Sequence, residues 1–279
     1  MPIVTLLTDF GHQDGFVGCL HGVILTRCPS ATIVDLCHEI RPYDVPGASF
    51  LLEGVRPCFG PGTIHVAVVD PGVGGPRRPV LALIDGQFFV APDNGLLTAP
   101  LERARQSAVR ELTAGEFWRH PVSHSFHGRD IFAPVAGHLA AGVAPDRFGP
   151  LIADPVRLTL PRARHAHGQV QGEVIWVDRF GNCVTNIPGE SLASGVCVWH
   201  AGQPLAFVDH FGGVPAGSSA ALVGSSGYVE LFVNQGDFAK SRSARVGDEV
   251  TLDGRAVESG QDDGRHIGPS ESRARFDSL

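Results

Sequence analysis

The spacing of apolar residues changes near residue 142, and this change constrains the fold more than any other feature of the chain. Before it, apolar runs of strand length alternate with segments whose apolar residues recur at helical spacing. We expect strands at 3–8, 31–36 and 63–70, and helices at 14–27 and 45–55. Such alternation is typical of βαβ units. The sequence therefore predicts an α/β fold in which residues 1–142 form an N-terminal, Rossmann-like domain with a mainly parallel sheet.

Capping and turn residues refine this first domain. Asp14 stands where it would cap the amino end of the first helix. Residues 80–91 have the pattern of a β-hairpin, with Asp85–Gly86 as its turn. A last helix is expected over 126–142 and should end near its closing glycine. The domain is thus expected to end on a helix, just before the pattern changes.

The rest of the chain has a different pattern. Residues 143–168 are rich in Pro, Arg and His and are expected to form a connection. Over 169–253, short strand-like runs are separated by glycine and Asx turns, which predicts a smaller C-terminal antiparallel β-barrel or sandwich domain. The tail over 254–279 is polar and rich in Gly and Ser, so we expect it to be disordered.

Composition excludes several classes of function. The net charge of −7 comes without a basic stripe, so we expect no nucleic-acid partner. Charge-free stretches are far too short to cross a bilayer, and the N-terminal segment reads as a strand rather than a signal peptide. We therefore expect no membrane association and a cytoplasmic location. Thirteen histidines invite a metal site, but neither H-E-x-x-H nor C-x-x-C spacing occurs, so no metal ligand is assigned.

Two acidic residues fall where an open parallel sheet collects its ligands, at the carboxyl ends of strands. Asp9 follows the first expected strand and Asp70 ends the third, and each precedes a glycine-rich turn. A third such turn is PDNG at 92–95. Each Asp could instead only cap its own turn. None of the turns matches G-x-G-x-x-G or a Walker A loop, so a dinucleotide or nucleoside-triphosphate site is not supported.

Two further residues could join Asp70 in one reacting centre. Arg77 lies seven residues beyond it, after a turn that could fold the arginine back, and His127 stands at the start of an expected helix. A carboxylate, a guanidinium and an imidazole together can activate water for attack on a substrate. Spacing alone leaves open whether the three meet, because a histidine at a helix start can also be structural.

Six motifs then occur in order: TDFGHQDGFVG, VVDPGVGGPRRPV, APDNGLLT, SFHGRDIFAPVAGHLA, VDRFGNCVTNI and GSSGYVELFVNQGDFA. Together they closely resemble the S-adenosyl-L-methionine hydroxide adenosyltransferases, or SAM hydrolases, which are related to the fluorinases and chlorinases. The resemblance covers residues 3–252. It implies an α/β N-terminal domain, a β-rich C-terminal domain and a homotrimer with active sites at subunit interfaces.

The resemblance also implies the reaction. Activated water or hydroxide would attack C5′ of the ribose of S-adenosyl-L-methionine, giving adenosine and L-methionine with no cofactor or metal. Asp70, Arg77 and His127 match the water-activating set, although the adjacent Arg78 could be the arginine concerned. The halogenases lack the Asp and the His, which favours water over halide. A chlorinase-like transferase, a metallohydrolase and a non-catalytic protein that binds adenosine or S-adenosyl-L-methionine remain as alternatives.

The same resemblance assigns substrate contacts. It matches Asp9 to the ribose hydroxyls, Asp14 and Asp178 to the methionine ammonium, Asn182 and Phe180 to adenine, Tyr43 to an aromatic contact, Ser225 and Ser226 to the methionine carboxylate, and the Gln235 backbone to adenine. Asn94 and Tyr228 lie within matched motifs and are also expected to contact substrate. One departure concerns Ser226, which stands where the fluorinases have an arginine, so recognition of the carboxylate must differ here.

Overall fold

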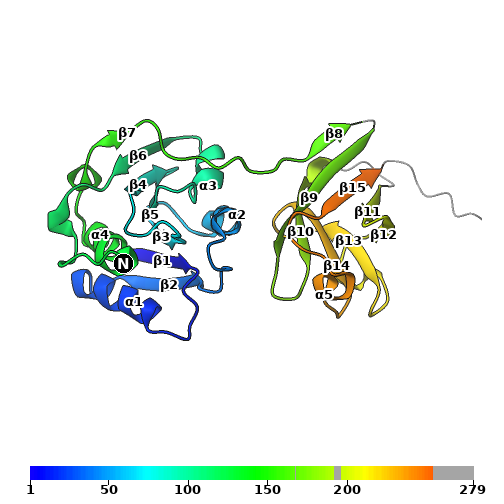
Figure 1. The fold of residues 1–279 in the computed structure, drawn as a ribbon, viewed down its shortest axis with the longest axis horizontal. Helices are drawn as coiled ribbons and strands as arrows, with labels where there is room; N and C mark the ends of the chain where they lie inside the picture. Colours follow the sequence, from blue (N-terminus) through cyan, green and yellow to red (C-terminus); the bar gives the residue numbers. More distant parts are fainter. Residues whose placement is uncertain (167, 192–195, 254–279) are drawn as a thin grey trace, which may run out of the picture. The chain divides into compact units, whose positions relative to one another are not determined.

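The computed structural model describes residues 1–166, 168–191 and 196–253. The chain forms two compact units that divide between Arg162 and Ala163, and each is described here by itself (Figure 1). The expected disordered tail over 254–279 lies outside the described residues. Among the helices of the described ranges, none is long and apolar enough to span a membrane.

The first unit is built on a seven-stranded sheet in the order β2-β1-β3-β5-β4-β6-β7. Its strands are β1 (Ile3–Thr8), β2 (Thr32–Cys37), β3 (Ile64–Val68), β4 (Pro79–Ile84), β5 (Gln87–Pro92), β6 (Ser107–Glu111) and β7 (Leu151–Ile152). The pairings of β1 with β2, β1 with β3 and β3 with β5 are parallel, whereas β4, β6 and β7 add antiparallel pairings. The α/β prediction is confirmed, with an antiparallel extension at one edge.

Helices cover both faces of this sheet. They are α1 (Phe16–Arg27), α2 (Val45–Val55), α3 (Thr98–Glu102) and α4 (Ala133–Ala140). Figure 1 shows α1 beside α4 on one face, with α2 on the other. The pair can approach closely because Gly137 has no side chain: a Cβ there would lie 3.1 Å from the carbonyl oxygen of Ile24. Buried apolar residues such as Leu20, Val66 and Phe132 fill the core between α1, α4 and the sheet.

Two of the predicted helices agree with the sequence analysis, and one predicted cap does not. The expected helix over 45–55 is confirmed, and Asp44 caps it by accepting from the Gly47 amide at 2.9 Å. The predicted cap at Asp14 is wrong, because α1 begins after Gly15 and has no side-chain cap. The helix predicted over 126–142 is confirmed, although its first part is a π-helical turn, η3 (Gly128–Phe132), which continues directly into α4, and the helix ends shortly before Gly142.

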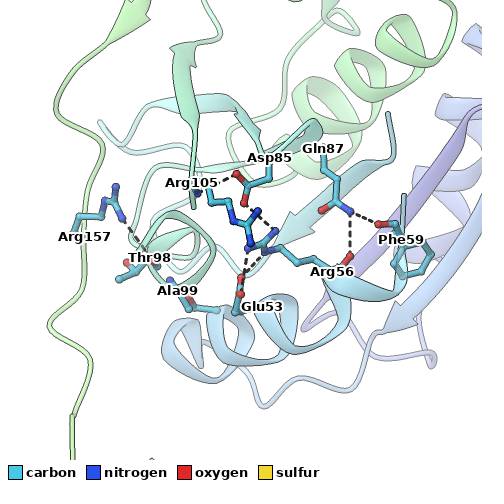
Figure 2. Close-up of polar contacts among 10 residues, drawn as sticks. Glu53, Arg56, Phe59, Asp85, Gln87, Thr98, Ala99, Arg105 and Arg157 are labelled. Atoms are coloured by element: carbon cyan, nitrogen blue, oxygen red, sulfur yellow. Dashed lines mark hydrogen bonds and ion pairs between the residues drawn. The ribbon is translucent and has the colours of Figure 1, made fainter. Parts of the chain in front are cut away.

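The predicted hairpin at β4–β5 is confirmed, with its turn at Asp85 and Gly86, both at positive φ. Figure 2 shows the side chains that fasten this turn to the end of α2. Arg56 donates to Glu53 at 2.6 Å and lies 3.6 Å from Asp85, which also accepts from the Arg105 backbone amide at 3.0 Å. Because the turn precedes β5, these charges lie at the edge of the sheet opposite the carboxyl ends of β1 and β3.

The second unit is a closed seven-stranded barrel. Its strands are β9 (Gln169–Val177), β10 (Cys183–Pro188), β11 (Cys197–His200), β12 (Gln203–Phe207), β13 (Ser219–Val223), β14 (Tyr228–Val233) and β15 (Glu249–Asp253). The order β10-β14-β13-β12-β11-β15-β9 closes through pairing of β9 with β10. The barrel alternative of the sequence analysis is therefore the one that forms, and closure leaves its strands without a free edge.

Two features of the barrel differ from the sequence expectation. The pairing of β12 with β13 is parallel, which the expected antiparallel pattern did not include. A parallel pair needs a crossover rather than a tight hairpin, and residues 208–218 supply it. A short helix, α5 (Phe238–Arg242), also buries Phe238 in the barrel core.

The stretch over 143–168, expected to be a connection, contains two short strands. Of these, β7 joins the first sheet, and β8 (Arg164–Ala166) pairs with β9.

Candidate active site

The first unit gathers its acidic candidates at one edge of the sheet. β1 and β3 are parallel neighbours, with Thr8 opposite Val68, so their carboxyl ends lie side by side. Asp9 directly follows β1, and Asp70 stands two residues beyond β3. This is the edge at which open parallel sheets bind ligands.

Asp70, Arg77 and His127 form one continuous group at this edge. The Nε of Arg77 donates to both carboxylate oxygens of Asp70, at 2.9 and 3.0 Å, and its Nη2 donates to Oδ2 as well. The same Nη2 lies 2.8 Å from Nδ1 of His127. Arg77 also stacks over the Phe132 ring, with 5.4 Å between Cζ and the ring centroid. The geometry thus brings together the three residues whose meeting spacing alone left open.

The glycine-rich turn after β3 explains how they meet. Gly74 has φ +76°, and a Cβ at this position would lie 2.0 Å from the backbone carbonyl oxygen of His124. Only glycine therefore lets the turn approach the segment that leads to His127. At Gly72, a Cβ would stand 3.6 Å from Cγ of Arg77, so the arginine folds back over this turn toward Asp70.

The bond between Arg77 and His127 decides how the imidazole can act. Arg77 has only donors, so Nδ1 of His127 must be the acceptor. Burial, followed by the positive charge of Arg77, lowers the pKa of His127 against the opposing effect of Asp70. The imidazole is therefore neutral near pH 7, with its hydrogen on Nε2. In this state His127 can donate a hydrogen bond to a ligand but has no free ring nitrogen that could take a proton.

Arg78 belongs to a separate group. Its Nε donates to Asp93 at 2.8 Å, and its Nη1 and Nη2 donate to the carboxylate and carbonyl of Asp154, at 2.9 and 2.8 Å. Asp93 in turn accepts from the Val156 amide at 2.8 Å. These bonds fasten the extended segment around 154–156 to the PDNG turn. Of the two arginines that the sequence left open, Arg77 is thus the one that contacts Asp70.

The other candidates of the first unit lie in turns. Oδ2 of Asp9 accepts from the Tyr43 amide at 3.0 Å, and the Tyr43 side chain is 71% exposed, at a backbone φ of +69°. Asn94 bridges its turn to the end of β3, since Nδ2 donates to the Val69 carbonyl at 2.9 Å. Asp14 lies in the exposed turn before α1. Asn94 therefore has a bonded structural role in addition to any contact with a ligand.

In the second unit, Asp178 fixes the turn that carries Phe180 and Asn182 largely through backbone amides. Oδ1 of Asp178 accepts from the amides of Phe180 and Asn182, at 2.8 and 2.9 Å, and its Oδ2 accepts from Nδ2 of Asn182 at 3.0 Å. This turn leaves the Phe180 side chain 75% exposed. The other candidates flank β14: Ser225 and Ser226 lie in the turn before it, Tyr228 begins it, and Gln235 follows it at φ +55°.

One buried carboxylate of the second unit escaped the sequence analysis. Glu230 is 8% exposed in β14. A hydrogen bond with the Asn182 side chain favours the ionised form of its carboxyl group. Burial, followed by the charge of Asp178, raises the pKa of Glu230 against that hydrogen bond. Gly224 makes room for it, because a Cβ there would lie 2.2 Å from Oε2. The sequence could have pointed to Glu230, because a charged residue inside the apolar run YVELFV is unusual for a buried strand.

No cluster of three or more His, Cys, Asp or Glu side chains suited to a metal ion occurs in the part of the chain that the structure describes. The groups that gather at the sheet edge are instead a paired carboxylate and guanidinium with a neutral imidazole. Such a set can orient water and take up a proton.

Comparison with known proteins gives matches over most of the chain. Residues 4–149 match the SAM hydroxide adenosyltransferase N-terminal domain, and residues 172–251 match the C-terminal domain of that family. An (R)-S-adenosyl-L-methionine hydrolase of Thermus thermophilus is 37% identical, covering 90% of this chain and 100% of its own. Its counterpart in Salinispora tropica is 38% identical, covering 90% and 97%.

More distant relatives and solved structures are also similar. A fluorinase of Actinopolyspora mzabensis is 27% identical, covering 90% of this chain and 97% of its own. The crystal structure of an uncharacterized conserved protein from Thermotoga maritima has a TM-score of 0.85 at 36% identity, covering 90% of this chain and 99% of that one. The identities to hydrolases thus exceed the identity to this fluorinase.

Proposed function

Because this chain belongs to the SAM hydroxide adenosyltransferase family, we propose that it hydrolyses S-adenosyl-L-methionine to adenosine and L-methionine, with Asp70, Arg77 and His127 as its reacting centre. One observation carries the assignment of the centre: Arg77 bonds at once to the carboxylate of Asp70 and to Nδ1 of His127, at the carboxyl edge of the sheet. Ser225 and Ser226, in the second unit, are assigned to the methionine carboxylate.

The chemistry of the substrate defines what this centre must supply. The sulfur is a sulfonium, so it departs from C5′ as a neutral thioether and needs no general acid. Neutral water is a weak nucleophile, and the barrier therefore lies in activating and aiming it. A site of low polarity helps, because the developing negative oxygen and the positive sulfonium neutralise one another as the bond forms.

The protonation state of the centre assigns a separate role to each residue. Nε2–H of His127 donates to the oxygen of the attacking water, and Asp70 accepts one of the water's hydrogens. As the oxygen bonds to C5′, the C5′–S bond breaks and its electron pair stays on sulfur, while the proton passes to Asp70 and later to solvent. Arg77 keeps both partners oriented through its bonds to them. The products are adenosine and L-methionine, and the step uses no metal or cofactor.

The remaining candidates are assigned to substrate binding. Asp9 would hold the ribose hydroxyls, Asn182 and Phe180 the adenine, and Asp14 and Asp178 the ammonium group. The exposure of the Phe180 ring supports a stacking role, since an exposed aromatic face can receive a base. We also propose a homotrimer with its active sites at subunit interfaces, as the family resemblance implies. Sedimentation equilibrium tests the trimer, and a monomeric mass would contradict it.

Three alternatives make different predictions. A halide-using transferase would form 5′-chloro-adenosine when chloride is added, and the hydrolase would not. A non-catalytic binding protein would retain S-adenosyl-L-methionine without releasing adenosine. A metallohydrolase would lose its activity reversibly with a chelator. The higher identity to the named hydrolases, 34–38% against 26–27% for the named fluorinases, favours water as the nucleophile.

The decisive test is incubation of the purified protein with S-adenosyl-L-methionine in ¹⁸O-water, followed by mass spectrometry of the nucleoside. Label in the 5′-hydroxyl of adenosine is expected, because the new bond joins water oxygen to C5′. Unlabelled adenosine would reject this route. Absence of any adenosine would reject the hydrolase altogether.

A further inference from the structure

A second buried histidine lies beside the proposed ribose-binding residue and has no role in the chemistry above. His38 directly follows β2, and its side chain is fully buried. Nδ1 of its ring lies 2.8 Å from Oγ1 of Thr8, the last residue of β1. Its Nε2 lies 3.1 Å from Oδ1 of Asp35. A carboxylate, an imidazole and a hydroxyl thus form a chain that ends at the residue before Asp9.

The hydrogens in this chain can be placed from its chemistry. Nε2 of His38 has no geometrically formed hydrogen bond within the described part of the chain, but the ionised Asp35 carboxylate 3.1 Å away favours a hydrogen on this nitrogen, which leaves Nδ1 as the acceptor. The Thr8 hydroxyl therefore donates to Nδ1, while its oxygen accepts from the Phe10 amide at 3.2 Å. Burial lowers the pKa of His38 against the opposing effect of Asp35, and the nearby His12 and His21 also disfavour a charged ring. His38 is therefore neutral near pH 7.

The same residue also holds the other end of the turn. The backbone carbonyl of His38 accepts from the Gly11 amide at 2.7 Å, and Gly11 has φ +66°. The turn over 8–11 is thus fastened by the His38 ring at its first residue and by the His38 carbonyl at its last. Asp9 lies between these two anchors, and its carboxylate accepts from the Tyr43 amide.

The order of acid, imidazole and hydroxyl is also that of the nucleophile group in serine hydrolases. Thr8 is fully buried, however, and its oxygen already accepts from the Phe10 amide. No substrate carbon can reach it, so the group holds the backbone rather than attacking a ligand.

We infer that His38 is a positioning residue that sets the direction of Asp9 and, through it, the affinity for the ribose of the substrate. This inference rests on the proposed function of Asp9.

The chain contains its own matched control. His65, in β3, is also buried, and its Nδ1 lies 2.7 Å from Oγ1 of Thr5 in β1. This ring stacks on Phe89 in the core, with 4.7 Å between centroids, and its threonine lies in the middle of the strand. The two histidines share burial and partner type, and only His38 holds a turn that carries a site residue.

The test compares His38→Phe, which keeps a ring but loses the bond to Thr8 and the contact with Asp35, with His65→Phe. We expect His38→Phe to raise KM for S-adenosyl-L-methionine and Kd for adenosine about tenfold, with kcat within about threefold. His38→Asn keeps an acceptor for Thr8 and should restore most of the affinity. Amide hydrogen exchange in a peptide spanning the turn should speed up in His38→Phe only. His65→Phe should lower the melting temperature and leave KM unchanged.

Two results would overturn the inference: an unchanged KM and exchange rate in His38→Phe, or equal changes in His65→Phe. If His38→Phe does not fold, Thr8→Val removes the same hydroxyl bond and should give the same rise in KM. The proposed function fails separately, when the wild-type protein releases no adenosine. In that case the exchange comparison still decides whether His38 holds the turn.

Discussion

The two units fix their candidate residues in different ways. In the first unit, the reacting side chains bond to one another, as Arg77 does to Asp70, seven residues away, and to His127, 50 residues away. In the second unit, one carboxylate, Asp178, fixes the turn that ends at Asn182 mainly through backbone amides. A reacting centre needs charges held at set distances from each other, whereas a binding turn needs a set shape. Changes in the reacting centre of the first unit should therefore act on kcat, and changes in the binding turn of the second unit on KM.

The largest effects should come from removing the reacting groups. Asp70→Ala and His127→Ala should each lower kcat by about 10²–10⁴-fold, because the first removes the proton acceptor and the second removes the hydrogen bond that aims the water. The Kd of adenosine should change much less, because neither residue is assigned to the nucleoside. Single-turnover rates and isothermal titration measure the two quantities. Full activity in both variants would remove this group from the mechanism.

The adjacent arginines offer a matched pair for the next effect. Arg77→Lys keeps the charge but loses the fork that holds two partners, so kcat should fall about 10- to 100-fold. Arg78→Lys should lower the melting temperature by loosening the segment around Asp154, while kcat stays near the wild-type value. Equal losses of kcat in the two variants would show that the contact with Asp70 is not what matters.

In the second unit the effect should move to binding. Asn182→Ala should raise KM about tenfold, the effect of one lost hydrogen bond, with kcat within about threefold. Asn186→Ala is the control, because both asparagines are 7% exposed and Asn186 bonds instead to the Glu173 amide. A fall in kcat without a rise in KM for Asn182→Ala would contradict the division between the units.

The smallest effect concerns stability rather than turnover. Burial lowers the pKa of His65 from 6.5 to about 4, so the unfolded chain takes up this proton first as the pH falls. The neutral, buried His65 contributes fully to the free energy of unfolding above pH 6.5. This contribution is lost as the pH falls from 6.5 to about 4, and the total loss is roughly 3 kcal/mol. Urea unfolding of wild type and His65→Phe between pH 7 and pH 4 measures it. An equally steep loss in His65→Phe would contradict this source.

Sequence reasoning succeeded where local signals and burial agree. The β1 strand, the β4–β5 hairpin and the helix from Val45 were predictable because the spacing of apolar residues or a turn sequence indicates each of them locally. The parallel pairing of β12 with β13 was not, since a crossover of irregular residues leaves no periodic pattern. At Asp14, a favourable capping residue lies one position too early to bond the first turn of the helix.

The same contrast between local signals and long-range contacts applies to the site residues. Strand ends located Asp9 and Asp70 because the carboxyl edge of a parallel sheet can be read from the chain. The choice between Arg77 and Arg78 could not be made that way, because it depends on which side of the sheet edge each arginine faces. Glu230 and His38 were missed for a related reason. Each acts through a neighbour distant in sequence, Asn182 for Glu230 and Thr8 for His38.

The close approach of Gly74 to the His124 carbonyl has a consequence for how this chemistry could be lost or kept. A residue without any functional group sets the distance across which the arginine must reach the imidazole. Replacing Gly74 would abolish the reaction although every acid, base and cation of the centre remained in the sequence. A survey of relatives that scores only the reactive side chains would count such a protein as active, and would have to inspect this glycine to tell the difference.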